Sequence, residues 1–288
     1  MKPPSPVDPL SFVSAGDPAE SREPLVQLER LVKRYGAKVA VRDMTLTLFS
    51  GEVFAFLGPN GAGKTSTLRM TTGLLRPDAG RVRVCGFDMR TDARRAKRHL
   101  AYVPDLPFLY DKLTGREFIE FAREMYGVPR ELAAKRLEEL IDRLDMNSFL
   151  DQLTESYSHG MKQKTALAAA LIHAPRVLIV DEPIVGLDPR TVRVIKDIFR
   201  EIASAGGVVF MSTHTLDVAE AVADRIGIIR SGELVGLGTL EELRRAAERY
   251  ERLEDIFLHL TGEQFGDGDG DGLGPPRGGA AAARRGIP

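Results

Sequence analysis

The sequence predicts an α/β fold, with a mainly parallel core sheet and a helical subdomain inserted into it. Three features support this fold class: apolar runs without polar alternation, a long segment of helical periodicity between two of these runs, and a glycine-rich turn directly after the first run. The chain has 288 residues, of which 43% are apolar, enough to bury one large core or two small ones. We therefore expect one α/β domain with an inserted lobe.

The predicted core strands are residues 53–57, 177–180 and 208–211. Their side chains are apolar without interruption, which is typical of strands in a parallel sheet that is covered on both faces. Two further strands are predicted at residues 226–229 and 233–237, on either side of a short polar turn.

Helical periodicity separates the first two of these core strands. Apolar residues recur there at three- and four-residue spacing, as on one face of a helix. These residues are Phe118, Phe121 and Met125, followed by Leu137, Leu140, Ile141 and Leu144. We expect the helical lobe to occupy about residues 106–168. Further helices are predicted at residues 165–173, at residues 189–203 and from Thr239, which forms a capping box with Glu242.

The two ends of the chain differ from its middle. Residues 1–24 contain six prolines and lack the apolar centre of a secretion signal, and residues 263–288 are rich in glycine. We expect both segments to be disordered, which leaves residues 25–262 as the folded domain. No run approaches the roughly 18 uninterrupted apolar residues of a membrane helix. Any membrane-spanning part is therefore expected to belong to another chain.

The balance of charge gives no reason to expect a nucleic-acid partner. Lysine and arginine total 40 and aspartate and glutamate 41, so that the formal net charge is −1. The basic run at residues 94–98 is typical of a solvated helix face, with a local binding site as the alternative. The single cysteine, Cys85, excludes an intrachain disulfide and a zinc site built on several cysteines, which fits a reducing cytosol.

A phosphate-binding loop directly follows the first predicted strand. Its three glycines allow a tight turn that points backbone N–H groups at phosphates. Lys64 supplies a positive charge to the outer phosphates, and the hydroxyl of Thr65 is a ligand for Mg²⁺. The loop consists of Gly58, Pro59, Asn60, Gly61, Ala62, Gly63, Lys64 and Thr65, and Ser66 follows it.

A predicted helix begins near Lys64, with Leu68, Thr72 and Leu75 on one face. Because the N-terminus of a helix carries a partial positive charge, this helix favours an anion at the same place. The loop and the helix together predict a nucleoside triphosphate with magnesium as the ligand.

Two acidic residues follow the second core strand. Asp181 and Glu182 stand at its carboxyl end, where open α/β sheets bind their ligands. We expect Asp181 to hold Mg²⁺, through water, opposite Thr65, and Glu182 to orient and deprotonate an attacking water molecule.

With these two motifs the chain resembles the nucleotide-binding subunits of ATP-binding cassette (ABC) transporters, over about residues 25–260. The resemblance implies a P-loop NTPase fold with a mainly parallel core sheet, an antiparallel β subdomain and the inserted helical subdomain. It also implies ATP as the nucleotide, with Mg²⁺, and two partners, namely a polytopic membrane permease and a second cassette of the same or another kind. The subunit would lie in the cytoplasm, on the inner face of the cell membrane.

Two single residues match positions of this family. Tyr35 is similar to the aromatic residue that stacks on adenine, a contact that gives dispersion energy with little base selectivity. The alternative is a half-buried tyrosine that precedes a strand. His214, at the end of the third core strand, matches the switch histidine that would contact the γ-phosphate.

The segment Ser158, His159, Gly160 and Met161 resembles the family signature, usually Leu-Ser-Gly-Gly-Gln, with Tyr157 in the first position. The resemblance implies that Ser158 and the N–H of Gly160 bind the γ-phosphate of ATP held by the other cassette. His159 replaces a glycine and Met161 a glutamine, which leaves the contact geometry open. For Ser158 alone, a helix N-cap is the alternative.

Two aspartates also stand at positions of this family. Asp188 is similar to the residue of the loop that crosses the dimer interface, and Asp188 followed by proline also predicts the N-cap of the next helix. Asp105 stands where the family generally has a glutamine. It adds a full negative charge with a shorter reach, so that it either ligates Mg²⁺ directly or contacts it through water.

The stretch at residues 108–117 resembles a bacterial branch of the family that is linked mostly to export-type permeases. Within it, Phe108 and Tyr110 are either contacts for the permease or core residues of the lobe. The leading hypothesis is an ATPase subunit that energises a membrane transporter, with Lys64, Glu182 and His214 as its catalytic residues. The alternatives are a soluble ABC ATPase without a permease, and a regulatory cassette that hydrolyses ATP weakly because of Asp105 and His159.

Overall fold

A six-stranded sheet forms the centre of the molecule, in the order β10-β9-β3-β8-β7-β6. The structure is a computed structural model and describes residues 22–184, 186–246 and 253–261. The neighbouring strands are parallel except β10, which pairs antiparallel with β9. The strands are β3 (Glu52–Leu57), β6 (Leu100–Val103), β7 (Val177–Asp181), β8 (Val208–Thr213), β9 (Arg225–Arg230) and β10 (Glu233–Gly238). The predicted core strands are thus confirmed, and β8 continues past the predicted end to Thr213.

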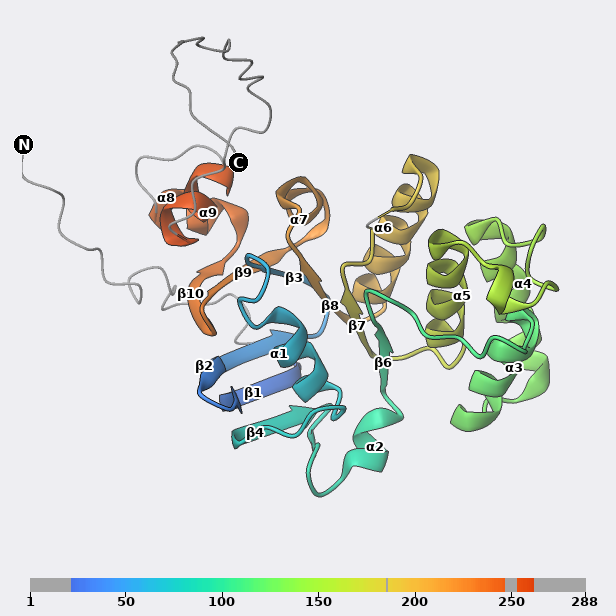
Figure 1. Cartoon of the computed structure of the whole chain (residues 1–288), viewed down its shortest axis with the longest axis horizontal. Coiled ribbons are helices and arrows are strands. Elements are labelled where there is room, and N and C mark those ends of the chain that lie inside the picture. The colour runs from blue at the N-terminus through green and yellow to red at the C-terminus, as the bar shows by residue number, and fades with distance from the viewer. Residues whose placement is uncertain (1–21, 185, 247–252, 262–288) are drawn as a thin grey trace, which may run out of the picture.

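A second, antiparallel sheet has the order β2-β1-β4-β5 and lies beside the first (Figure 1). Its strands are β1 (Pro24–Tyr35), β2 (Lys38–Phe49), β4 (Ala79–Val84) and β5 (Phe87–Asp88). The expected antiparallel β subdomain is therefore confirmed. The two segments predicted to be disordered were residues 1–24 and 263–288. Residues 1–21 and all of the second segment lie outside the described residues. Pro24 belongs to β1, so the prediction for the first segment was wrong at that residue.

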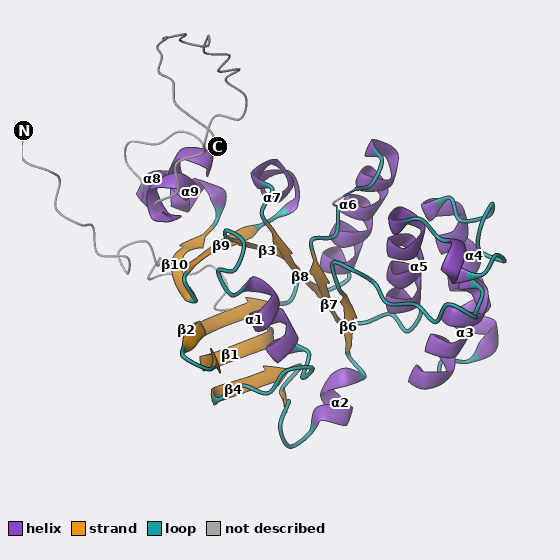
Figure 2. Ribbon diagram, in the orientation of Figure 1, coloured by secondary structure: helices purple, strands orange, loops and turns teal. Residues whose placement is uncertain are grey.

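Helices cover the central sheet, and three of them gather at one end of the molecule (Figure 2). These three, α3, α4 and α5, lie between β6 and β7 in the chain, as the predicted fold class requires. The helices are α1 (Lys64–Thr71), α2 (Ala93–Lys97), α3 (Gly115–Tyr126), α4 (Arg130–Leu144), α5 (His159–Leu171), α6 (Pro189–Ser204), α7 (Leu216–Val222), α8 (Leu240–Ala246) and α9 (Leu253–Thr261). A short 3₁₀ helix spans Thr154–Ser156.

Two helix predictions need correction. α1 ends at Thr71, because Gly73 adopts a left-handed conformation with φ of 68° and turns the chain away before Leu75. α5 begins at His159, six residues before the predicted start, because Ser158 caps it. The signature segment is therefore the first turn of the alanine-rich helix itself.

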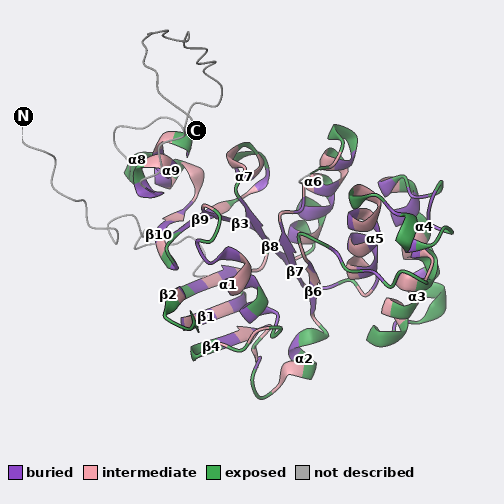
Figure 3. Ribbon diagram, in the orientation of Figure 1, coloured by how far each residue is buried: buried purple, intermediate pink, exposed green. Residues whose placement is uncertain are grey.

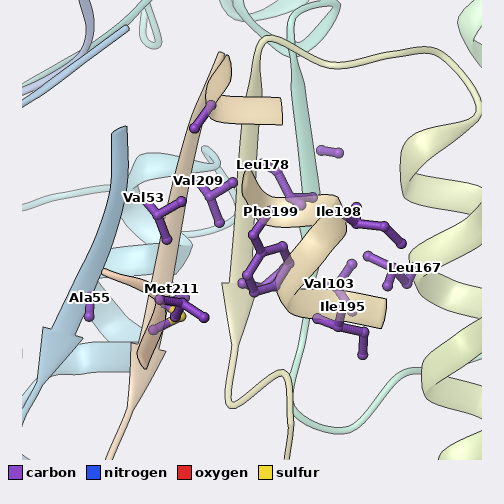
Figure 4. Packing of buried hydrophobic residues seen from close by; sticks show 14 of the residues in the cluster. Val53, Ala55, Val103, Leu167, Leu178, Ile195, Ile198, Phe199, Val209 and Met211 are labelled. Carbon is purple, nitrogen blue, oxygen red and sulfur yellow. The ribbon is translucent and has the colours of Figure 1, made fainter. Parts of the chain in front are cut away.

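The central strands are buried on both faces, as their apolar composition predicts (Figure 3). Alternate residues of β3 enter two different cores: Val53 joins the cluster formed with α5 and α6, and Phe54 joins the cluster shared with the antiparallel sheet and α1. Figure 4 shows Ile195 and Phe199 of α6 packed against these strands. Full burial of a side chain such as Phe199 stabilises the fold by about 1.5–3 kcal/mol, and it fixes the carboxyl ends of β3, β7 and β8 relative to one another.

Candidate nucleotide-binding site

The phosphate loop begins where β3 ends and closes on the first turn of α1. Gly63 is the N-cap of α1, with φ of 112°, and a Cβ atom there would lie 2.4 Å from the carbonyl oxygen of Ala40. A Cβ atom on Gly58 would lie 2.5 Å from the carbonyl oxygen of Ile229. Both positions therefore require glycine, because β2 and β9 approach the loop too closely for any side chain.

Lys64 folds back over this loop and is nearly buried. Its Nζ donates hydrogen bonds to the carbonyl oxygens of Gly58, at 2.5 Å, and Pro59, at 3.3 Å. The same Nζ lies 3.9 Å from Oε1 of Glu182. The ammonium group is thus held within the loop, at the start of α1, where the positive end of the helix also favours an anion.

The loop opens into a cavity of about 290 Å³. The described residues that line it include most of the predicted nucleotide-binding set, namely Tyr35, Pro59, Asn60, Gly61, Gly63, Lys64, Thr65, Ser66, Asp105, Asp181 and Glu182. Tyr35 is the last residue of β1 and is 50% exposed, with its hydroxyl 3.4 Å from Oγ of Ser66. Its ring stands at the cavity wall, accessible to a planar base.

Asp181 is the last residue of β7 and is only 3% exposed. Its carboxylate accepts a short hydrogen bond from the hydroxyl of Ser212, on the neighbouring strand β8. The hydrogen bond orients this carboxylate toward the cavity that Thr65 also lines. The parallel pairing of β7 with β8 sets Asp181 opposite Ser212 and thereby produces this contact.

Glu182 connects three parts of the site. Its backbone is left-handed, with φ of 50°, and its N–H donates to the carbonyl oxygen of Ser212 at 3.0 Å. Oε1 lies 2.9 Å from Nδ1 of His214, and Oε2 accepts a hydrogen bond of 3.4 Å from the N–H of His214. A left-handed conformation costs a residue other than glycine about 1–2 kcal/mol. Here it turns the carboxylate away from the strand and into the space between Lys64 and His214.

Oxygen atoms suited to Mg²⁺ meet in this cavity. The hydroxyl of Thr65 and the carboxylates of Asp105 and Asp181 all line it. Among the described residues, however, no three His, Cys, Asp or Glu side chains lie close enough together to hold a metal ion by themselves. Mg²⁺ commonly completes its shell with phosphate oxygens and water, so this sparse donor set fits a cation that arrives with a nucleotide.

Tyr102, on β6, lies behind these carboxylates. Burial, reinforced by the negative charge of Asp181, raises the pKa of Tyr102 to about 12. A phenol is neutral at physiological pH even at its ordinary pKa of about 10, so Tyr102 adds no charge to the site.

The signature residues lie outside the cavity. Ser158 is the N-cap of α5, and its Oγ accepts a hydrogen bond of 3.3 Å from the N–H of Met161. A Cβ atom on Gly160 would lie 3.3 Å from the side chain of Leu187, so the start of α5 packs against the loop that leads to α6. His159 is exposed beside the same loop.

Asp188 also lies outside the cavity and caps α6, as its sequence predicts. Its carboxylate accepts hydrogen bonds from the N–H of Thr191 at 2.9 Å and from the hydroxyl of Thr191 at 2.6 Å. These hydrogen bonds hold the pKa of Asp188 below its ordinary value. Within one chain, therefore, the structure brings the phosphate loop, Tyr35, Asp105, Asp181, Glu182 and His214 together, but not the signature residues or Asp188.

Two residues of the cavity were not predicted, namely Lys38 and Ala40 at the start of β2. Tyr35 pairs with Lys38 across the hairpin between β1 and β2. A tyrosine followed by glycine and, three positions on, a lysine is a detectable sign of this turn, and it places the lysine beside the ring.

Comparisons with known proteins agree with this geometry. A family model described as "ABC transporter" matches residues 41–185. The linearmycin resistance ATP-binding protein LnrL of Bacillus subtilis (strain 168) is 36% identical over 219 residues, which are 76% of this chain and 70% of that protein. The daunorubicin/doxorubicin resistance ATP-binding protein DrrA of Streptomyces peucetius is also 36% identical over 219 residues, 76% of this chain and 66% of that protein.

A solved structure has the same fold. It is described as an ATP binding subunit of an ABC transporter and superposes with a TM-score of 0.79 at 31% sequence identity, over 82% of this chain and 99% of that one. None of the described helices of this chain is both long and apolar enough to cross a membrane.

Proposed function

Because the chain belongs to the ABC transporter family, as an ATP-binding and ATP-hydrolysing subunit, we propose that it hydrolyses MgATP in a site shared by two cassettes and so drives a membrane permease. The observation that carries this proposal is that Lys64, Asp181 and Glu182 line the same cavity, with His214 hydrogen-bonded to Glu182.

ATP is bound by the backbone of residues 58–65, by Ser66 and by Lys64, which exchanges its carbonyl contacts for the outer phosphates. Tyr35 stacks on the adenine ring, and Lys38 lies beside it at the cavity wall. Mg²⁺ would be held by Thr65, Asp181 and Asp105, and when bound it neutralises the phosphate oxygens and the crowded carboxylates of the cavity.

Glu182 acts as the general base. Water attacks the γ-phosphorus, the new P–O bond forms as the bond to the departing ADP oxygen breaks, and Glu182 accepts the proton of the water. In the described structure the carboxylate of Glu182 lies between Lys64 and Nδ1 of His214. Movement of Lys64 to the phosphates removes one of these contacts and leaves His214 to hold the carboxylate in place.

The second half of the site comes from another cassette. Ser158, His159, Gly160 and Met161 lie outside the cavity of their own chain, exposed or partly exposed at the start of α5. We propose that they contact the γ-phosphate held by a facing subunit, with Asp188 at the interface between the two. A homodimer and a heterodimer both satisfy this arrangement.

The permease docks on the helical side of the cassette, at the cytoplasmic face of the membrane. Phe108 is 81% exposed and Leu106 74% exposed, so the alternative that Phe108 is a core residue of the lobe is wrong. Asp105 lines the nucleotide cavity, whereas its neighbours Pro104, Pro107 and Phe108 line a groove on the other side of the same loop. This loop therefore links nucleotide binding to docking. The resistance functions in the names of LnrL and DrrA support an export-type transporter.

Steady-state ATP hydrolysis by the purified chain, with Glu182→Gln beside the wild type, tests the proposal. We expect turnover to fall at least about a hundredfold, because a general base contributes that much or more, while ATP affinity is retained. Lys64→Ala is the matched control and should lose affinity for ATP instead. Wild-type turnover in Glu182→Gln would contradict the role of the base, and an almost inactive wild type would favour a regulatory cassette.

A further inference from the structure

One buried hydroxyl beside the nucleotide cavity lacks a hydrogen-bond partner. The phenolic oxygen of Tyr102 is shielded from solvent, and no described residue forms a hydrogen bond with it. An unpaired buried donor destabilises a fold, so that native structures contain few such groups. We therefore expect this hydroxyl to find an acceptor in another state of the site.

The pairing of the strands brings Tyr102 close to the residues that would hold Mg²⁺. β6 pairs in parallel with β7, so that Tyr102 lies opposite Ile179, two residues before Asp181. Because side chains alternate between the faces of a sheet, Tyr102, Ile179 and Asp181 share one face. This is the face that α1 covers, where Tyr102 packs against the core cluster that contains Leu68. A step of two residues along a strand is about 7 Å, which the length of a tyrosine side chain can span.

Three charged side chains act on the phenol. Burial raises the pKa of Tyr102 most, the negative charges of Asp181 and Asp105 raise it further, and the nearby guanidinium of Arg69 lowers it. An arginine offers donors only, so Arg69 cannot accept the proton of the hydroxyl. The two carboxylates can accept it, and Asp181 acts on Tyr102 more strongly than Asp105 does.

Asp181 has an oxygen atom available for this proton. Its Oδ1 accepts the hydroxyl of Ser212, whereas its Oδ2 accepts no hydrogen bond within the described part of the chain. β7 lies between β8 and β6 in the central sheet (Figure 1). Ser212 on β8 and Tyr102 on β6 therefore flank the carboxylate of Asp181 from the two neighbouring strands.

From this arrangement we propose that Tyr102 is a positioning residue of the magnesium site. In the MgATP complex its hydroxyl donates a hydrogen bond to Oδ2 of Asp181, while Ser212 holds Oδ1. The two hydrogen bonds fix the orientation in which the carboxylate meets the cation, since the partners of a metal-binding carboxylate set its geometry. The proposal rests on the proposed function and adds one residue to its metal site.

Tyr102→Phe tests the proposal on the full chain, because it removes only the hydroxyl. The affinity for a fluorescent, non-hydrolysable ATP analogue is measured with Mg²⁺ and again in EDTA. We expect Tyr102→Phe to weaken binding about three- to tenfold with Mg²⁺, the range for one hydrogen bond, and to leave binding in EDTA unchanged. Tyr126→Phe is the matched control. Its hydroxyl donates to the carbonyl oxygen of Leu100, in the same strand, and its loss should leave both affinities unchanged.

Thermal unfolding without nucleotide distinguishes this role from a structural one. Since the hydroxyl is unpaired in the described structure, Tyr102→Phe should unfold at the midpoint of the wild type or above it. Added Mg²⁺ and analogue should then raise the midpoint less in Tyr102→Phe than in the wild type. A lower midpoint in the absence of nucleotide would show that the hydroxyl supports the fold itself, and would overturn the proposal.

An Asp105→Asn background identifies the carboxylate through which Tyr102 acts. There Tyr102→Phe should still weaken binding with Mg²⁺ by the same factor, because the hydrogen bond is to Asp181. Loss of the effect in this background would transfer the hydrogen bond to Asp105 and contradict the role of Asp181.

The remaining outcomes also contradict the proposal. Equal weakening with Mg²⁺ and in EDTA would assign Tyr102 to the shape of the cavity, and unchanged binding under both conditions would leave its hydroxyl without a role. In either case the wild type still binds the analogue, so that the proposed function stands. A wild type that binds no analogue at all would refute the proposed function itself.

Discussion

Glu182 has a left-handed backbone, and its carboxylate lies between Lys64 and His214. Its position after Asp181 predicts a base at the carboxyl end of a strand, and this place was expected from the sequence. Its left-handed φ of 50° and its contact with His214 were not expected from the sequence. Both depend on the register between β7 and β8, which brings Ser212 and His214 beside it. Non-local pairing of this kind leaves no local pattern in the sequence.

His173 predicts a pH dependence of stability. Its ring stacks on that of Tyr126, with the ring centroids 3.6 Å apart. Burial lowers the pKa of His173 from 6.5 to about 4. Between these two values the unfolded chain binds a proton that the folded chain does not, so the free energy of unfolding falls as the pH falls. For pKa values of about 6.5 and 4, the loss between pH 7.5 and pH 5 is about 2 kcal/mol.

Urea unfolding at these two pH values measures the loss. His173→Phe keeps an aromatic ring against Tyr126 and should remove most of the pH dependence, whereas His99→Gln, which retains His173, should keep it. Carboxylates with lowered pKa values titrate below pH 5, outside the interval from pH 5 to pH 7.5, so they contribute little to this loss. An identical pH dependence in the wild type and His173→Phe would show that another group is responsible.

Five of the six strands of the central sheet were predicted from the sequence, whereas β6 and the strands of the antiparallel sheet were not. β3, β7 and β8 are apolar throughout, since both faces are covered. β1 pairs with two neighbours through several register shifts, and Arg30 within it has φ of 46°. Such bulges interrupt the alternation of apolar and polar residues by which a strand is recognised. The predicted start of α5 at residue 165 was too late, because its cap, Ser158, lies seven residues before the alanine-rich stretch that marked it.

Asp188 allows a test at the level of one element. Asp188→Ala removes the two hydrogen bonds to Thr191 that cap α6, and we expect it to lower the free energy of unfolding by about 0.5–2 kcal/mol. Asp188→Asn keeps a capping oxygen and should remain close to the wild type in stability. Both substitutions should weaken ATP-dependent dimerisation if Asp188 also acts at the interface.

Thr114→Ala is the matched control, because Thr114 caps α3 in a capping box with Glu117, away from the nucleotide cavity. It should lower stability by a similar amount, measured by urea unfolding, and leave dimerisation unchanged in sedimentation experiments. Wild-type dimerisation by Asp188→Asn would restrict Asp188 to its role as a cap.

At the scale of the molecule, the described chain contains two separate parts of one proposed site. The cavity holds the phosphate loop, Asp181 and Glu182, and the signature segment at the start of α5 is exposed outside it. The motifs and their order were predictable from the sequence, because each follows a recognisable strand or begins a helix. Their separation in space was implied only by family resemblance, since it depends on how α5 packs beside the sheet.

The most direct test of a shared site is the molar mass of Glu182→Gln in solution with and without MgATP. We predict one chain without nucleotide or with ADP and two chains with ATP, because the proposed shared site requires a γ-phosphate to join the phosphate loop of one cassette to Ser158 of the other. Adding Ser158→Arg should return the ATP-bound protein to a single chain. A Glu182→Gln protein that binds MgATP and yet keeps the mass of one chain, or that forms dimers equally well without ATP, would contradict the account.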